Sequence, residues 1–162
     1  SDYFILFHPR DIVSGDFYWA SRKCDQLIVV AADCTGHGVP GAFMSMLGVS
    51  FLNEIVNRLA GAGTLDSSEI LNQLRKQIIY SLHQTGKEGG SKDGMDVSIV
   101  VIDLIPAASE DKKMFRVQYS GANNPAYVIS SLVSLSQSPE PVEGIYEYFR
   151  RRQTETFQVL EV

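Results

Sequence analysis

Cysteine and basic charge are both scarce in this 162-residue chain. The two cysteines, Cys24 and Cys34, are too few for a disulfide framework and are not spaced as a CxxC metal motif. Lysine and arginine number 14 against 19 acidic residues, which gives a formal net charge of −5. This balance does not build the broad basic surface that nucleic acid or an anionic membrane requires. We therefore expect no nucleic-acid partner, no membrane contact by this domain and, from the cysteine usage, a cytoplasmic location.

Long apolar runs and a secretory leader are also missing from the sequence. No apolar run approaches the roughly 18 residues that span a bilayer, and the first residues carry no basic region or cleavage site. The chain begins and ends abruptly, so we expect both ends to be cut from a longer protein. With 44% apolar and 20% charged residues the composition is that of a globular domain. The length fits one domain, 1–162, with a core of its own.

Several motifs of covalent and nucleotide chemistry are absent. Cys34 does not start a Cys-x5-Arg phosphate loop, because the sixth residue after it is Pro40. Asp33 lacks the second aspartate that a haloacid-dehalogenase nucleophile needs two residues later, where Thr35 stands. The sequence has no GxSxG elbow, Walker loop or GxGxxG turn. These absences exclude the commonest protein nucleophiles and nucleotide-binding loops.

The segments that are present alternate between strand and helix patterns. Apolar and β-branched residues at 13–20 and 27–32, separated by polar residues 21–23, predict a hairpin. Two helices are predicted next, and strands follow again. Strands before and after a helical pair favour an α+β fold in which helices stack on antiparallel sheets. The later strands are predicted at 97–104, 115–119 and 126–129.

Two helices are predicted between the strand groups, the first apolar over most of its circumference and the second with one apolar stripe. Pro40 suits the first turn of the first helix, and the glycines of 61–63 end it. Asp66, with Glu69 three residues later, resembles the capping box that begins a second helix. The apolar rows are Met44, Leu47, Phe51, Ile55 and Leu59 with Leu52 and Val56 in the first helix, and Leu71, Leu74, Ile78 and Leu82 in the second.

The densest chemical signal is segment 33–38, DCTGHG, between an apolar strand and a helix. Glycine-rich backbone turns sharply there, so main-chain carbonyls and a helix N-terminus would lie close to any ion that Asp33 holds. The same residues also suit an ordinary strand-to-helix turn capped by Asp33. His37, between Gly36 and Gly38, is a turn former, a hydrogen-bond donor beside a metal or a general acid. The residues alone leave these alternatives open.

A second carboxylate, Asp16, lies on the preceding strand, where the hairpin would bring it beside Asp33. Two aspartates on neighbouring strands repel each other unless a cation lies between them. Hard oxygen ligands of this kind suit Mg²⁺ or Mn²⁺. Asp16 taken alone is also typical of a turn residue after Gly15. The pair predicts a divalent-cation site at one end of the sheet.

Four segments stand in order along the chain: 9–19 (PRDIVSGDFYW), 32–42 (ADCTGHGVPGA), 93–96 (DGMD) and 120–125 (SGANNP). In these segments the sequence resembles the bacterial PPM (PP2C-like) serine/threonine phosphatases of the SpoIIE/RsbU type. The resemblance implies an α-β-β-α sandwich, two antiparallel sheets flanked by helices, with a two-metal centre at one end of the sheets. It also implies a metal-activated water that hydrolyses phosphoserine or phosphothreonine without a protein nucleophile.

The resemblance assigns roles to individual residues by position. Asp16 matches the metal ligand of the first motif, and Asp33 matches the carboxylate that bridges two Mn²⁺ or Mg²⁺ ions. The main-chain carbonyl of Cys34 matches the neighbouring backbone ligand. Arg10 is a candidate contact for the phosphate, and His37 is a candidate supporting residue.

Glycines and two further aspartates complete the expected site. Gly15, Gly36 and Gly38 are expected to provide its turn geometry and to let the backbone approach closely. Asp93 and Asp96 are expected to lie outside the metal shell, because that segment starts a core strand in the family and an aspartate there would cap the strand.

The sequence departs from the family near its C-terminus. Family phosphatases carry two further aspartates late in the domain, and this sequence has no Asp after Asp111. Segment 144–146 and the final strand resemble the stretch upstream of the missing motif, so we expect the C-terminal part of the domain to be missing. A chain without those ligands is expected to bind metal weakly or not at all and to be weakly active or inactive.

The resemblance also implies partners. The parent protein is expected to dephosphorylate a phosphoprotein in a bacterial signalling pathway, for which an anti-anti-sigma factor with a STAS domain in a partner-switching system is a candidate. An N-terminal sensory domain is expected in the same parent chain. The alternative is a non-catalytic pseudophosphatase, a binding module that keeps the fold and lacks half of the metal shell.

Overall fold

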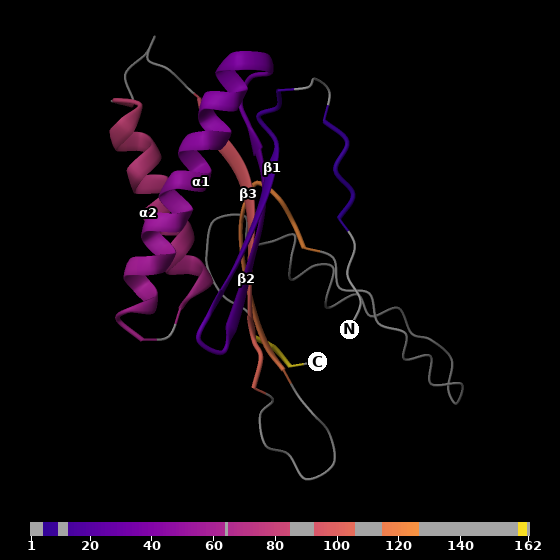
Figure 1. Ribbon diagram of the computed structural model, residues 1–162, viewed down its shortest axis with the longest axis vertical. Coiled ribbons are helices and arrows are strands. Elements are labelled where there is room, and N and C mark those ends of the chain that lie inside the picture. The colour runs from indigo at the N-terminus through magenta and orange to yellow at the C-terminus, as the bar shows by residue number, and fades with distance from the viewer. Residues whose placement is uncertain are drawn as a thin grey trace, which may run out of the picture.

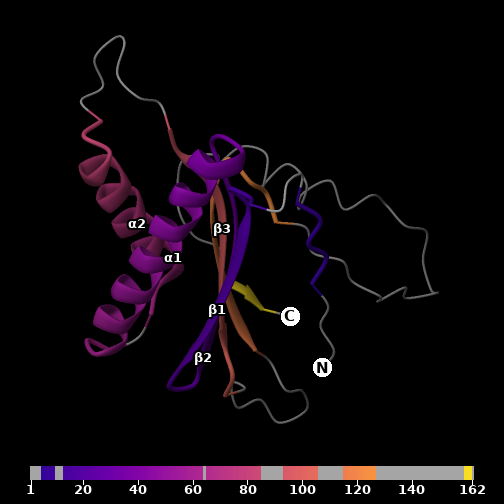
Figure 2. The ribbon, with the colours of Figure 1, turned by 45° about the horizontal axis from the view of Figure 1, so that its top comes forward.

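The computed structural model describes residues 5–9, 13–63, 65–84, 93–105, 115–126 and the backbone of 159–161. Its five strands form one antiparallel sheet in the order β1-β2-β3-β4-β5. Helices α1 and α2 cover the same face of this sheet, and the N-terminal segment lies on the other side (Figures 1 and 2). The elements are β1 (Phe17–Lys23), β2 (Gln26–Cys34), α1 (Gly38–Ala60), α2 (Ser67–Ser81), β3 (Met95–Asp103), β4 (Arg116–Ala122) and β5 (Val159–Glu161).

The predicted α+β class is confirmed by this arrangement. Among the described residues the structure shows one sheet and one helical layer, which correspond to half of the expected four-layer sandwich. The predicted strand at 126–129 lies outside the described residues except for its first position.

The hairpin of β1 and β2 turns later than the sequence predicts. Residues 21–23 were expected to form the turn but belong to β1, and the turn is made by Cys24 and Asp25. Cys24 adopts φ 51°, the left-handed conformation that such a tight turn uses. In the described sheet β1 is an edge strand, where polar side chains remain in water, so a polar segment can continue the strand. The strand also begins at Phe17, four residues later than expected.

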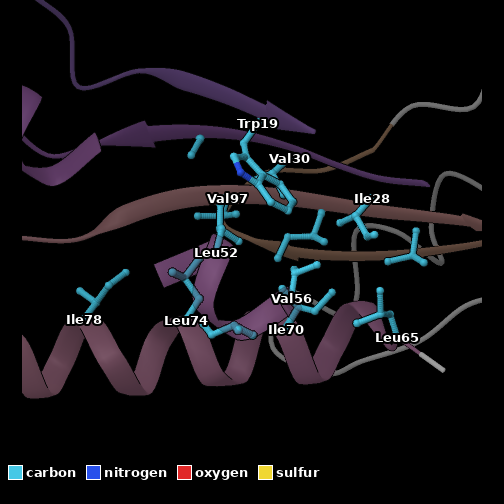
Figure 3. Packing of buried hydrophobic residues seen from close by; sticks show 14 of the residues in the cluster. Trp19, Ile28, Val30, Leu52, Val56, Leu65, Ile70, Leu74, Ile78 and Val97 are labelled. Atoms are coloured by element: carbon cyan, nitrogen blue, oxygen red, sulfur yellow. The ribbon is translucent and has the colours of Figure 1, made fainter. Parts of the chain in front are cut away.

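A single core lies between the sheet and the helices (Figure 3). Alternate residues of β2 and β3 point into it, as period-two burial along both strands shows. In α1 the second predicted row, Leu52 and Val56, is fully buried, whereas Phe51 is only half-buried. Among the described residues, the apolar side chains that are at most 1% exposed are Ile28, Val30, Leu52, Ile55, Val56, Leu65, Ile70, Leu74, Val97, Ile99 and Val101.

Hydrogen bonds fix the start of α2 on the sheet. The Asp66 carboxylate accepts from the backbone N–H groups of Ser68 and Glu69 at 2.8 and 3.1 Å, so the predicted N-cap is confirmed. Ser67 is fully buried, and its backbone N–H donates to Gln118 Oε1 of β4 at 3.2 Å. Ser67 Oγ also lies 2.9 Å from Ser120 Oγ. The buried polar side chains on the helix-facing side of β4 are therefore hydrogen-bonded to the start of α2.

Helix α1 is apolar over most of its length. By length and composition alone its 23 residues would suffice to cross a membrane, with a mean hydropathy of 1.4 over the best stretch. Its sequence nevertheless holds no unbroken apolar run of that length, because glycine, serine and asparagine interrupt the apolar residues. In the structure α1 packs against β1, β2 and α2 through Gly41, Met44, Gly48, Leu52, Ile55 and Val56, as a core helix does.

Candidate functional site

The register of the sheet places three aspartates in a row at one end. Phe17 pairs with Ala32, so Asp16, the residue before β1, lies beside Asp33. Asp33 pairs in turn with Asp96 on β3. Because neighbouring residues in these strands point into the core, all three aspartates lie on the sheet face away from the helices. The structure thus brings Asp16 and Asp33 together and adds Asp96, which sequence reasoning placed outside the site.

The carboxyl group of Asp33 is influenced by that of Asp16. The pKa of Asp33 is raised above its ordinary value of 3.8, first by a side-chain hydrogen bond to Asp16 and then by burial. The negative charges of Asp16 and Asp96 raise it further. A divalent cation beside these carboxylates would offset that repulsion.

Three glycines bring the loops around the carboxylates into close contact. A Cβ on Gly15 would lie 3.0 Å from the carbonyl oxygens of both Cys34 and Gly36. A Cβ on Gly41, in the first turns of α1, would lie 2.6 Å from Gly36 O and 3.1 Å from Gly15 N. The close approach predicted at Gly15 is therefore present, and two main-chain carbonyls converge on it. Gly41 was missed, although it lies within the segment 32–42 that carries the family resemblance.

The loop between β2 and α1 places the helix N-terminus at the site. Gly36 and Gly38 adopt φ 93° and 64°, conformations that favour glycine, so their expected role in turn geometry is supported. His37 occupies the N-cap position in an extended conformation, and its side chain does not cap the helix. The first N–H groups of α1, which point out of the helix, form an environment that attracts anions such as phosphate.

Two cavities flank Asp33. The larger, about 390 Å³, is called here the Asp96 cavity and lies between the ends of β2 and β3. The smaller, about 190 Å³, is called the Asp16 cavity and reaches His37 at the start of α1. Asp33 lines both. The other residues around the Asp96 cavity are Cys34, Thr35, Gly94, Met95 and Asp96, and those around the Asp16 cavity are Val13, Ser14, Gly15, Asp16, Gly36 and His37.

Two hydrogen bonds join Thr35 and Gly94, which both line the Asp96 cavity. The backbone N–H of Thr35 donates to Gly94 O at 2.9 Å, and the backbone N–H of Gly94 donates to Thr35 Oγ1 at 3.0 Å. They extend the pairing of β2 and β3 beyond the last strand residues. Asp96 lies inside β3, which begins at Met95, so the capping role expected for Asp96 was wrong. The contact of Thr35 with Gly94 and the position of Asp96 beside Asp33 both depend on the register of β2 and β3, which the sequence motifs do not reveal.

Cys34 offers its carbonyl and not its sulfur. The side chain is buried on the helix side of β2, and burial raises the pKa of the thiol to about 12, with the negative charges of Asp33 and Asp16 adding to the effect. A thiol in this state is protonated at neutral pH and is a poor nucleophile. The geometry therefore agrees with a backbone role for Cys34.

The two cysteines are expected to differ in alkylation. Cys24 is exposed in the hairpin turn, whereas Cys34 is buried with a raised thiol pKa. Treating the folded protein with N-ethylmaleimide at pH 7 should label Cys24 alone, and unfolding in guanidinium should expose Cys34. Peptide mass spectrometry measures both sites. Equal labelling of the two in the folded protein would contradict the buried position of Cys34.

The donors at the site are hard oxygens, which fit Mg²⁺ or Mn²⁺. They are the carboxylates of Asp16 and Asp33 and the carbonyls of Cys34 and Gly36, which converge on Gly15. Within the described part of the chain, no three His, Cys, Asp or Glu side chains are grouped so as to hold one ion. The donor types therefore fit these ions. The two carboxylates do not fill the coordination shell of an ion, so other ligands would have to complete it. Arg10, the expected phosphate contact, lies outside the described residues.

Solved structures similar to this chain are known. No protein-family model matches the chain, and no curated protein does. The chain is similar to the SiaA-PP2C domain of Pseudomonas aeruginosa, with 29% identity and a TM-score of 0.58 over 74% of this chain and 42% of that one. A Stage II Sporulation E family protein from Thermanaerovibrio acidaminovorans matches with 13% identity and a TM-score of 0.44 over 64% of this chain and 44% of its own. The chain thus spans less than half the length of each.

Proposed function

We propose that this chain, which has the PP2C-like fold of the SpoIIE-type phosphatases, is a metal-dependent protein serine/threonine phosphatase domain occupying residues 1–162. The observation that carries the proposal is the facing pair Asp16 and Asp33, beside two main-chain carbonyls and the N-terminus of α1. Carboxylates, carbonyl oxygens and a phosphate-attracting helix end are together suited to phosphoryl chemistry with a divalent cation.

Each described residue has a defined task in this proposal. Asp16, Asp33 and the carbonyl of Cys34 would hold Mn²⁺ or Mg²⁺, which when bound supplies Lewis acidity and lowers the pKa of the attacking water. The N–H groups at the start of α1 would orient the phosphoryl oxygens. His37, which is exposed and lines the Asp16 cavity, would donate a proton to the departing seryl or threonyl oxygen.

The proposal extends to the substrate, the partners and the location of the protein, on the basis of the same resemblance. The substrate would be a phosphoserine or phosphothreonine protein in bacterial signalling, with a STAS-domain anti-anti-sigma factor as the leading candidate. A sensory domain in the parent chain would control the phosphatase from its N-terminal side. The two free cysteines support a cytoplasmic site of action.

A non-catalytic binding module is the second candidate. It is favoured by one observation: in the part of the chain that the structure describes, no third carboxylate, histidine or cysteine joins Asp16 and Asp33 around one ion position. A module of this kind would bind the phosphoprotein through the same helix N-terminus without hydrolysing it.

Metal removal distinguishes the two candidates. The full natural chain is expected to release phosphate from a phosphoserine peptide in Mn²⁺, to lose that activity in EDTA, and to regain it when Mn²⁺ is restored in excess. A malachite-green assay measures the phosphate. Undiminished release in EDTA would contradict metal dependence, and peptide binding without release in Mn²⁺ would favour the binding module.

A further inference from the structure

The first turns of α1 carry a row of apolar side chains that face solvent. Val39, Phe43 and Met46 are 63%, 63% and 68% exposed. Their spacing of four and then three residues places them on one side of the helix, and we call them the α1 stripe. Single exposed apolar residues are common on protein surfaces, but a contiguous group of large ones is typical of a contact site for a partner.

The α1 stripe lies opposite the buried side of the helix. At about 100° per residue, it is centred roughly half a turn away from Met44, Gly48 and Leu52, which are buried in the core. Ser45 Oγ lies 3.2 Å from Ser14 O, within hydrogen-bond distance, and so ties the helix to the loop before β1. Rotating α1 to bury the stripe would break these contacts. The stripe is therefore a fixed part of the surface.

The apolar character of this side of α1 is confined to the end of the helix next to the site. Farther along the same side the exposed residues are polar: Ser50, Asn53 and Asn57. The stripe itself spans about 10 Å along the helix axis. It begins two residues after His37, which lines the Asp16 cavity. A helix side that only faces water needs no apolar residues at either end, so their position beside the site calls for a role there.

We propose that the α1 stripe is the surface on which the phosphoprotein substrate docks, with its phosphoserine or phosphothreonine at the N-terminus of α1. This inference rests on the proposed function and names the region that recognises the partner. A protein whose phosphate lies at the first N–H groups of α1 extends beyond the phosphate over the neighbouring surface, and the stripe is the apolar part of that surface. The substrate class is then a folded phosphoprotein that has an apolar surface beside its phosphorylated residue.

The size and charge of the stripe favour this occupant over a second copy of the chain. Three side chains of this kind expose on the order of 300 Å², whereas a stable dimer buries about 800 Å² on each partner. A contact this small suits a substrate that has to leave after the reaction. Residues 38–53 also carry no charge, although the chain has a net charge of −5. A phosphoprotein, which itself carries added negative charge, can therefore approach along this surface without local repulsion.

Kinetics on two substrates test the docking role in the full natural chain with Mn²⁺. The probes are p-nitrophenyl phosphate, which has no protein surface, and a serine-phosphorylated STAS-domain protein. Phe43→Gln should raise KM for the phosphoprotein at least about tenfold, keep its kcat within about twofold, and leave both constants for p-nitrophenyl phosphate unchanged. Ile105→Gln is the matched control, because Ile105 is 62% exposed and follows the end of β3 that lies away from the site. It should behave as the wild type on both substrates.

Two kinetic outcomes would overturn the inference and leave the phosphatase proposal standing. One is an equal KM of the wild type and Phe43→Gln for the phosphoprotein. The other is an equal loss on both substrates, because the change would then act on the site and not on docking. Hydrolysis of p-nitrophenyl phosphate alone by the wild type would remove the STAS-domain protein as a substrate and this inference with it. Hydrolysis of neither substrate would overturn the proposed function as well.

The other possible occupants of the stripe give different physical results. A wild-type dimer that Phe43→Gln converts to a monomer in sedimentation would assign the stripe to a second copy. A melting temperature lowered in Phe43→Gln and not in Ile105→Gln would mean that the chain itself covers the stripe. Either result would overturn the inference, which expects a wild-type melting temperature and the same sedimentation coefficient for both variants.

Discussion

Replacing Asp33 by asparagine is expected to lower Mn²⁺-dependent phosphate release at least about a hundredfold while the fold persists. Asp33 lines both cavities and matches the carboxylate that bridges the two metal ions in the family resemblance, so it is the proposed ligand whose loss should cost most. Losing it removes several kcal/mol of charge stabilisation in the transition state, and each ~1.4 kcal/mol corresponds to a factor of ten in rate. Initial rates on a phosphoserine peptide at saturating Mn²⁺ measure the effect. A variant with the wild-type rate would exclude the role proposed for Asp33.

The same variant should be at least as stable as the wild type without metal. The folded state raises the pKa of Asp33 above 3.8, so folding disfavours its ionised form. This contribution to stability is fully present below pH 3.8 and is lost as the pH rises through the raised pKa. Asparagine does not titrate, so Asp33→Asn should melt at or above the wild-type temperature at pH 7, and the difference should shrink toward pH 4. Asp16 and Asp96 are the charges that face Asp33, and His37 lines the same cavity.

Asp103→Asn is the control for both readouts. Asp103 lies at the far end of β3 and pairs with Gln26, away from both cavities. The variant has the same net charge as Asp33→Asn, so a general charge effect on peptide binding or stability would appear in both. Loss of activity in Asp33→Asn alone would place the effect at the site.

The meeting of Asp16 and Asp33 was predictable because it depends on local order. Both belong to one hairpin, and a short connection between two apolar strands leaves few pairings open. The hairpin turn itself begins three residues later than predicted. Ser21, Arg22 and Lys23 lie on β1, an edge strand of the described sheet, where polar side chains can remain in water. A polar segment does not by itself distinguish a turn from the exposed end of a strand.

The position of Asp96 beside Asp33 could not be predicted from the sequence, because the two residues come from distant segments. It lies 63 positions after Asp33 and is paired with it only through the register of β2 and β3. A shift of one residue in that register would move Asp96 to the core face and change its role entirely. The hydrogen bond that Asn123 Nδ2 donates to Asp96 Oδ2 likewise depends on the pairing of β3 with β4. Long-range pairing of this kind leaves no periodic signal in the sequence.

Gly41→Ala is expected to destabilise the protein by about 1–3 kcal/mol and to weaken Mn²⁺ binding at the site. In a helix interior this change usually stabilises by about 0.5–1 kcal/mol, because glycine has the larger entropy cost. Here the new Cβ would lie 2.6 Å from Gly36 O and 3.1 Å from the N and Cα atoms of Gly15, all of them backbone. Backbone on both sides can give way only by moving the loops that carry Asp16 and the Cys34 carbonyl. Urea denaturation measures the stability, and calorimetry measures Mn²⁺ binding.

Gly48→Ala, two turns later in the same helix, separates the effect of crowding from that of site geometry. Its Cβ would lie 2.8 Å from Phe17 Cζ and 3.1 Å from Met95 Cε, which are the ends of side chains and can shift. Both variants gain the same helix propensity, so the difference between them reports what the new methyl group meets. We expect Gly48→Ala to retain Mn²⁺ affinity within a few-fold of the wild type, whatever its cost in stability. Equal Mn²⁺ affinity in the two variants would mean that the contact of Gly41 with Gly15 and Gly36 does not position the carboxylates.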